Sequence, residues 1–269
     1  MSGGILFLIT LFIIVLSFAA DTVTKYIPFE VEQSLVNTVD IDVGTEGSGP
    51  IPVYLQTLAD SLGNKMDLPE GMNIKVSVIN SDTVNAFATL DGNVVFFTGL
   101  LDVIPNENTL AMVMAHEIAH IKLRHPLRAL GRGVVVGIAI ATITGAASND
   151  VVAGLIGNTG LLTALSFSRD QESAADKLAV EALVKFYGHA GGSKKLFEVF
   201  NKLNDQTNSR IPEFFATHPL SQNRSNSIEK QAQQNGWSLN GETSDIPESI
   251  IVELKRLQDE RKEAENTGN

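Results

Sequence analysis

The segment His116-Glu-Ile-Ala-His120 constrains the fold more than any other part of the chain. Residues four apart share a face only on an α-helix, so the two imidazoles can bind one metal ion if the segment is helical. Apolar residues recur around it at helical spacing: Leu110, Val113, Met114, Ile118 and Ile121. We therefore predict a helix that begins after Asn106, a typical capping residue, and ends after His125 because Pro126 follows.

A catalytic zinc site needs a third protein ligand and one open position for water. The chain has no cysteine, so this ligand must be another histidine or a carboxylate. Glu172 is the best candidate, and Asp176 lies four residues later on the same predicted helix face. The small residues Ser173, Ala174 and Ala175 would let this helix approach the first one closely. Alternatively, the two acidic residues form a solvated pair.

Several polar side chains have predicted roles around such an ion. Glu117 would act as the general base that assists attack of zinc-bound water on a peptide carbonyl. Asp176 would accept a hydrogen bond from a ligand imidazole and fix its tautomer. His218 would stabilise the oxyanion, or pack locally in a His-Pro turn. Arg224 would pair with Asp176, or lie on the surface as an ordinary arginine, and we expect His125 to bind helix carbonyls.

A small antiparallel sheet is predicted before the histidine helix. Residues 73–80 alternate apolar and polar side chains, and a second strand begins near Val84, turns at Asp91-Gly92 and returns through residues 93–98. The stretch 84–90 could bind an extended substrate along its edge.

That edge would be lined by Asn85, Ala86 and Phe87. The alternative is a plain core strand with Phe87 turned inward.

Residues 1–20 are predicted to be a membrane anchor or a cleaved signal peptide, because residues 5–20 carry no charge. The chain that follows is acidic, so the positive-inside rule does not hold it in the cytoplasm. We expect a membrane-anchored protein whose catalytic domain is extracytoplasmic, periplasmic if bacterial, or one exported after signal cleavage. Membrane lipid is then a partner through the N-terminal segment.

The rest of the chain is expected to form one domain over residues 21–240 and a charged C-terminal helix and tail over residues 241–269. Residues 133–167 contain a single charge and could form a lid, a packed core hairpin or a membrane-inserting segment.

The formal net charge of −11 excludes a non-specific nucleic-acid binder. A local basic cluster follows the histidine helix and could face anionic lipid: Lys122, Arg124, Arg128 and Arg132.

The stretch from His116 to His125, followed by Glu172-Ser-Ala-Ala-Asp176, resembles the M48 family of zinc metallopeptidases. Asn85-Ala-Phe87 and His218-Pro219 with Arg224 agree with it. The resemblance implies an α+β, mainly helical, zincin-like fold with one zinc ion per chain. It also implies ligands His116, His120 and Glu172, with Glu117 as general base. The chain departs from the family in having Ala88-Thr-Leu-Asp-Gly92 where Ala-Leu-Pro-Gly-Gly is common.

The sequence therefore predicts a zinc-dependent endopeptidase of the single-anchor or periplasmic quality-control type. Its substrates would be misfolded, unfolded or membrane-proximal proteins. The alternative is a zinc-stabilised, chaperone-like protein that holds chains in the same cleft without cutting them. An intact Glu117 favours the enzyme, because metal ligation alone does not require that carboxylate.

Overall fold

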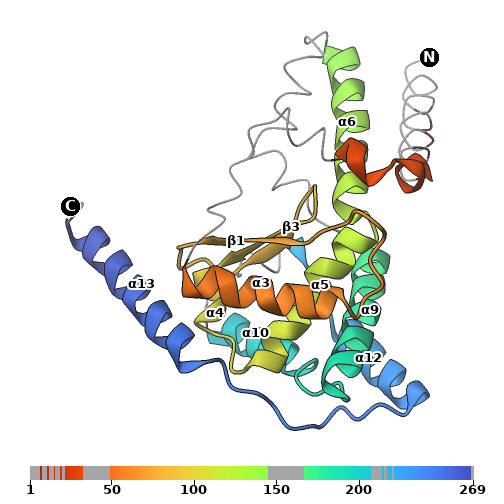
Figure 1. The fold of residues 1–269 in the computed structure, drawn as a ribbon. Helices are drawn as coiled ribbons and strands as arrows, with labels where there is room; N and C mark the ends of the chain where they lie inside the picture. The colour runs from red at the N-terminus through yellow and green to blue at the C-terminus, as the bar shows by residue number, and fades with distance from the viewer. Residues whose placement is uncertain are drawn as a thin grey trace.

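Helix α5 (Glu107–Lys122) lies at the centre of the fold, and every residue from 108 to 121 in it is buried. A computed structural model describes residues 7, 11, 15, 19, 22–32, 49–144, 167–206, 214, 217–219 and 221–267. The Asn106 side chain accepts a hydrogen bond from the backbone N–H of Thr109, which confirms the predicted cap. A helix buried on all sides needs neighbours all around, and Figure 1 shows the sheet, α3 and α9 surrounding α5.

The described elements form an α+β, mainly helical fold, as predicted. In chain order they are η1 (Thr24–Tyr26), α3 (Pro50–Gly63), β1 (Lys75–Ile79), β2 (Ala86–Ala88), β3 (Asn93–Phe97), α4 (Thr98–Leu101), α5, α6 (His125–Thr144), α9 (Arg169–Tyr187), α10 (Lys195–Gln206), α12 (Gln222–Asn235) and α13 (Glu248–Thr267). The charged C-terminal helix expected from the sequence is α13, which extends away from the body (Figure 1).

Helix α9 is the main packing neighbour of α5. Fully buried alanines lie on both helices: Ala111, Ala115 and Ala119 on α5, and Ala175, Ala179 and Ala182 on α9. Such small side chains allow two helix backbones to approach closely. The prediction that small residues let the two helices pack together is therefore confirmed for Ala175. Ser173 is exposed and does not contribute to the contact.

The sheet is mixed, with the strand order β1-β3-β2. Strands β2 and β3 pair antiparallel as predicted, whereas β1 is parallel to β3, so a purely antiparallel sheet is wrong. The reason lies in β3, whose residues 93–96 are all buried and which therefore takes the central position between the other two strands. The chain reverses after β1, so β2 runs opposite to both β1 and its partner β3.

The turn between β2 and β3 falls at Asp91-Gly92, as predicted. Both residues have positive φ, 58° and 73°, and the backbone N–H of Asn93 donates to the carbonyl of Leu90 at 3.3 Å. These are the features of a type I′ hairpin turn, which favours Asp-Gly. A Cβ on Gly92 would lie only 2.0 Å from the carbonyl oxygen of Asn73, so the position also requires glycine for space.

The prediction that Pro126 ends the histidine helix is wrong. Helix α5 ends at Lys122, Arg124 adopts φ 59°, and His125 begins α6 with Pro126 in its first turn. Proline is tolerated there because the first N–H groups of a helix have no intrahelical acceptor. The left-handed Arg124 therefore separates two helices that the apolar pattern did not distinguish.

The N-terminal segment docks at this junction. Glu32, only 3% exposed, accepts a hydrogen bond from the Asp91 backbone N–H at 2.9 Å and pairs with Arg124 at 2.9 Å. Arg124 also donates to the carbonyl of Ile27 and lies 5.4 Å from the centre of the Phe29 ring. Residues 27–32 are thereby held against both the hairpin and the end of α5.

The proposed lipid-facing cluster has partners inside the protein. Lys122 donates to the carbonyl of Met66, Arg124 pairs with Glu32, and Arg132 donates to the Gln171 side chain at 3.4 Å. These three contacts give the cluster a role within the fold, and its contact with anionic lipid stays a prediction.

Within the described residues, no helix combines the length and the apolar character needed to cross a bilayer. The predicted anchor or signal at residues 1–20 is described only at positions 7, 11, 15 and 19. Most of the apolar segment 133–167 that we considered as a lid, a hairpin or a membrane insertion lies outside the described residues, apart from the end of α6 and Phe167.

We expect Gly92→Ala to destabilise the fold by about 1–3 kcal/mol, because it puts a Cβ into a left-handed turn and against a backbone carbonyl. Gly133→Ala is the matched control, since a Cβ there meets nothing within 4 Å. Urea unfolding would measure both. Equal free energies of unfolding for the two variants would contradict the account of the turn.

Candidate active site

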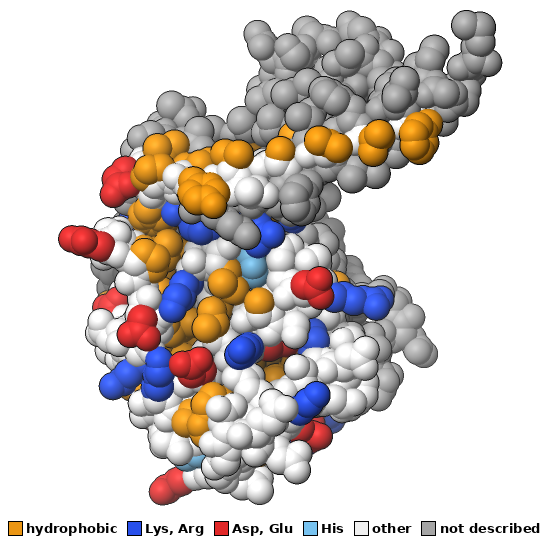
Figure 2. All heavy atoms as spheres, turned by 90° about the vertical axis from the view of Figure 1, so that its right-hand side faces the viewer, with side chains coloured by type: hydrophobic (Ala, Val, Ile, Leu, Met, Phe, Trp, Pro, Cys, Tyr) orange, Lys and Arg blue, Asp and Glu red, His pale blue; other side chains and the backbone are white. Residues whose placement is uncertain are grey.

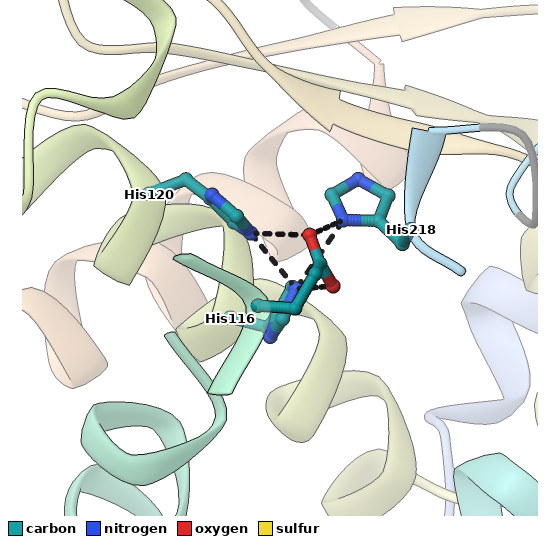
Figure 3. A group of neighbouring side chains, drawn as sticks. His116, His120 and His218 are labelled. Carbon is teal, nitrogen blue, oxygen red and sulfur yellow. Dashed lines mark hydrogen bonds and ion pairs between the residues drawn. The ribbon is translucent and has the colours of Figure 1, made fainter. Parts of the chain in front are cut away.

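Four side chains converge between α5 and α9. His116 and His120 come from α5, Glu172 from α9 and His218 from a separate segment, and their ligand atoms all lie within 4.8 Å of one another. Figure 3 shows the three imidazoles with ring nitrogens pointing toward a common centre. The Nε2 atoms of His116 and His120 are 2.9 Å apart, and each lies 3.4 Å from a Glu172 oxygen. The structure thus assembles the three ligands proposed from the sequence.

A hydrogen-bonded N-terminal cap fixes the start of α9 and therefore the position of its two carboxylates. Ser168 and Gln171 form a capping box, in which each side chain bonds the other residue's backbone N–H. Glu172 and Asp176 then lie one turn apart on the face toward α5, and both are buried. They are not a solvated pair, which was the alternative considered from the sequence.

Asp176 lies behind the first histidine. Its Oδ1 is 3.0 Å from His116 Nδ1, while Arg224 donates to both Asp176 oxygens at 2.7 Å. The same guanidinium is 2.7 Å from Glu172 Oε2 and donates to the Pro219 carbonyl. Arg224 therefore joins the two acidic residues of α9 to the segment that carries His218, and it is not an ordinary surface arginine.

The carboxylate of Glu117 lies beside the cluster of His116, His120, Glu172 and His218. Glu117 is completely buried, and its carboxylate has no side-chain hydrogen bond among the described residues. The Ala88 backbone and His218 Nε2, which lies 3.5 Å from Oε1, are polar groups beside it. Burial raises its pKa, although the nearby imidazoles of His218 and His116 oppose the shift. A buried carboxylate with a raised pKa beside a ligand cluster is suited to taking up and releasing a proton.

His218, predicted to stabilise the oxyanion, lies within hydrogen-bond distance of two proposed ligands. Its Nδ1 is 3.1 Å from Glu172 Oε1 and 3.3 Å from His116 Nε2, while its Nε2 is 3.5 Å from Glu117 Oε1. The Phe214 ring stacks on it at 4.8 Å. The sequence indicated a catalytic role for His218, but the structure also makes it a possible fourth ligand.

The donor set fits zinc. Imidazole nitrogens and a carboxylate without thiolate are ordinary zinc ligands. The surroundings fit a cation as well, because among the described residues three buried carboxylates (Glu117, Glu172 and Asp176) lie at the cluster, and the guanidinium of Arg224 pairs with two of them. Burial would lower the pKa of His116, but Asp176 and Glu172 outweigh it and raise the pKa to about 9. The cluster therefore attracts positive charge at the place where an ion would lie.

Strand β2 lies beside the site, in the stretch predicted to line a substrate-binding edge. Asn85 and Thr89 face β3, since Asn85 O accepts from the N–H of Phe97 and the N–H of Thr89 donates to Asn93 O. By alternation, Ala86 and Ala88 direct their backbone groups away from β3, and the Ala88 backbone bonds the Glu117 carboxylate. Phe87 is buried with Val95, Ala129 and Phe167, so the inward orientation considered as the alternative is correct.

His125 bonds a different partner from the one we expected. Its Nδ1 lies 2.8 Å from Nδ1 of His120 rather than on helix carbonyls. Burial first, and then Arg128, lower the pKa of His125 to about 3. The ring of Phe167 stacks on His120 with a centroid distance of 4.1 Å. Sequence spacing gave no signal for this contact, because residues five apart do not share a face of a continuous helix.

Comparison with known proteins agrees with this geometry. A family model described as peptidase family M48 matches residues 53–232. The beta-barrel assembly-enhancing protease of Escherichia coli is 33% identical over 210 residues, covering 70% of this chain and 41% of that protein. The metalloprotease LoiP of the same organism is 29% identical, covering 68% and 71% respectively. The mitochondrial metalloendopeptidase OMA1 of Arabidopsis thaliana is 29% identical over 58% of this chain and 31% of its own length. The chain thus spans about two fifths of the first of these relatives, and the match over residues 53–232 shows that it belongs to peptidase family M48.

Proposed function

We propose that this protein is a zinc-dependent endopeptidase. One observation carries the proposal: a His/His/Glu ligand set is buried beside Glu117, whose buried carboxylate has no side-chain hydrogen bond among the described residues. A site that only held a metal for stability would gain nothing from that carboxylate and would incur the cost of burying it. Family membership supports the same reading.

His116, His120 and Glu172 would hold the ion. Bound there, zinc would supply Lewis acidity and lower the pKa of a water molecule. Glu117 would take the proton from the attacking water and deliver it to the leaving amine, and its raised pKa favours that exchange. His218 would donate a hydrogen bond to the oxyanion, because its ring lies between the ligands and Glu117.

Asp176 and Arg224 would act on the ligands rather than on the substrate. Asp176 lies 3.0 Å from the ring nitrogen of His116 that faces away from the cluster centre, so it would fix the tautomer in which Nε2 is free to bind the ion. Arg224 would keep Asp176 ionised and in place through its two hydrogen bonds. Burial raises the pKa of that carboxyl, but the hydrogen bonds from Arg224 and His116 outweigh burial and hold the pKa below its usual range.

An extended substrate would bind along β2. Ala86 and Ala88 would offer backbone groups along the edge of β2 that faces away from β3, beside Glu117, and Asn85 marks the start of that edge. Recognition through main-chain hydrogen bonds gives affinity with little sequence selectivity. Unfolded or flexible chains are therefore the substrate class that this edge fits, and misfolded or membrane-proximal proteins are the proposed natural substrates.

We expect Glu117→Gln to lower the turnover of a quenched unfolded peptide by about 10²–10⁴-fold, because it removes the general base. Zinc content should stay at the wild-type level, since the ligands are unchanged. The assay would compare wild type, variant and chelator-treated wild type. Glu181→Gln, at a surface glutamate of α9 that pairs with Lys185, is the matched control and should cleave normally.

Equal cleavage by wild type, Glu117→Gln and the chelated protein would contradict the peptidase. Zinc-dependent binding of unfolded chains by all variants, with no cleavage by any of them, would instead support the chaperone-like alternative.

We expect His218→Asn to lower kcat while leaving zinc affinity nearly unchanged, because an oxyanion donor acts mainly in the transition state. Zinc affinity would be measured by competition with a chelator, and kcat and KM with the same peptide. A large loss of zinc affinity would show that His218 is a ligand and would contradict the role proposed for it.

We also propose that residues 1–20 place the catalytic domain outside the cytoplasm, as a retained anchor or a cleaved signal. Figure 2 shows a row of apolar side chains along the helical segment that projects from the body, with Lys and Arg side chains on the body beneath it. Phe7, Leu11 and Val15 are 66%, 45% and 56% exposed. Lipid would cover exposed apolar side chains of this kind.

Cell fractionation with N-terminal sequencing tests this proposal. We expect either a membrane-bound chain with an intact N-terminus or an exported chain that begins near residue 21, because the apolar run ends there. In both cases the catalytic domain should be accessible to external protease in cells whose outer barrier has been opened. An intact chain in the soluble cytoplasmic fraction would contradict the proposal.

A further inference from the structure

The two histidine ligands of α5 are supported by different groups. His116 Nδ1 lies 3.0 Å from the Asp176 carboxylate, whereas His120 Nδ1 lies 2.8 Å from a ring nitrogen of His125. Both supporting residues are buried, with 3% and 2% of their surface exposed. One ligand therefore has a charged hydrogen-bond acceptor behind it and the other has another imidazole.

The geometry fixes which nitrogen of His120 carries a proton. Its Nε2 lies 2.9 Å from His116 Nε2 and 3.4 Å from Glu172, so Nε2 faces the centre of the cluster and is the atom that would bind an ion there. A neutral imidazole that gives the lone pair of Nε2 to a metal must carry its proton on Nδ1. That N–H is inside the protein, since His120 is 0% exposed, and it needs an acceptor.

His125 supplies that acceptor only in one state. A neutral imidazole has one donor and one acceptor nitrogen, so His125 must leave Nδ1 unprotonated and carry its own proton on Nε2. Phe167 covers the pair, because its ring stacks on His120 at 4.1 Å and lies 5.8 Å from the His125 ring. This packing leaves little access for a water molecule to act as acceptor instead.

We propose that His125 is a positioning residue for the zinc ligand His120, holding its ring and its tautomer by accepting the Nδ1–H hydrogen bond. The proposal rests on the proposed zinc site and adds a residue to it. The contact depends on the left-handed Arg124, which ends α5 and turns the chain so that His125 faces back toward His120. A zinc ligand that loses such a partner binds its metal about 10–100-fold more weakly.

The test is zinc affinity in the full chain, measured by competition with a chelator. We expect His125→Leu, which fills space without an acceptor, to weaken zinc binding about 10–100-fold. His125→Asn keeps an oxygen near the position of Nδ1 and should stay within about threefold of wild type, because the buried N–H keeps a partner. His189→Asn, at a histidine outside the cluster, is the control and should bind zinc normally.

Several results would overturn the proposal. One is normal zinc affinity in His125→Leu, and another is an equal loss in the Leu and Asn variants, which would indicate packing alone. Wild-type protein that binds no zinc would instead refute the underlying zinc site, so the two failures are distinguishable.

A spectroscopic measurement on the unmodified protein keeps the proposal testable even if the variants fold poorly. In zinc-loaded protein with ¹⁵N-labelled histidine, we expect Nδ1 of His120 to be protonated and Nδ1 of His125 to be unprotonated. A protonated Nδ1 on His125 would overturn the proposal.

Discussion

The contact between α5 and α9 brings two imidazoles and two carboxylates together inside the protein. Several other features of the fold support that contact. Alanines on both helices allow the close approach, and the capping box at Ser168 fixes where α9 begins. Burying carboxylates is costly unless cations balance them. Arg224 balances part of the charge of Glu172 and Asp176, and a divalent ion would balance the remainder. The same electrostatic constraint thus explains both the structural arginine and the affinity for metal.

A second constraint acts through the junction between α5 and α6. Arg124, in a left-handed conformation, contacts Glu32 from the N-terminal segment, and the next residue contacts the ligand His120. Glu32 also bonds the β2–β3 turn. Three parts of the structure therefore meet at this junction. They are the segment that follows the predicted anchor, the β2–β3 hairpin with its proposed substrate edge, and His125, which contacts the ligand His120. This arrangement ties the geometry of the site to the way in which the N-terminal segment docks.

The sequence predicted what depends on local periodicity and on motifs. Helical spacing placed His116 and His120 on one face, and the Asp91-Gly92 pair marked the hairpin turn. The absence of cysteine helped to select Glu172. The parallel pairing of β1 was not predicted, because strand order depends on which strand is buried on both faces. The end of α5 was also missed, since a left-handed Arg124 has no sequence signature comparable to glycine. The His120–His125 contact follows from the left-handed turn at Arg124, and the position of His218 among the ligands follows from packing between segments far apart in the sequence. Spacing alone encodes neither.

The account depends most on the claim that this cluster binds zinc, and X-ray absorption at the zinc edge of the purified protein tests it most directly. We predict one zinc ion per chain with nitrogen and oxygen ligands at about 2.0–2.2 Å, at least two of them imidazoles, and no sulfur. Glu172→Gln should weaken binding and remove the carboxylate contribution. A protein that binds no zinc, or whose bound zinc is unaffected by substitutions at His116, His120 and Glu172, would contradict the account.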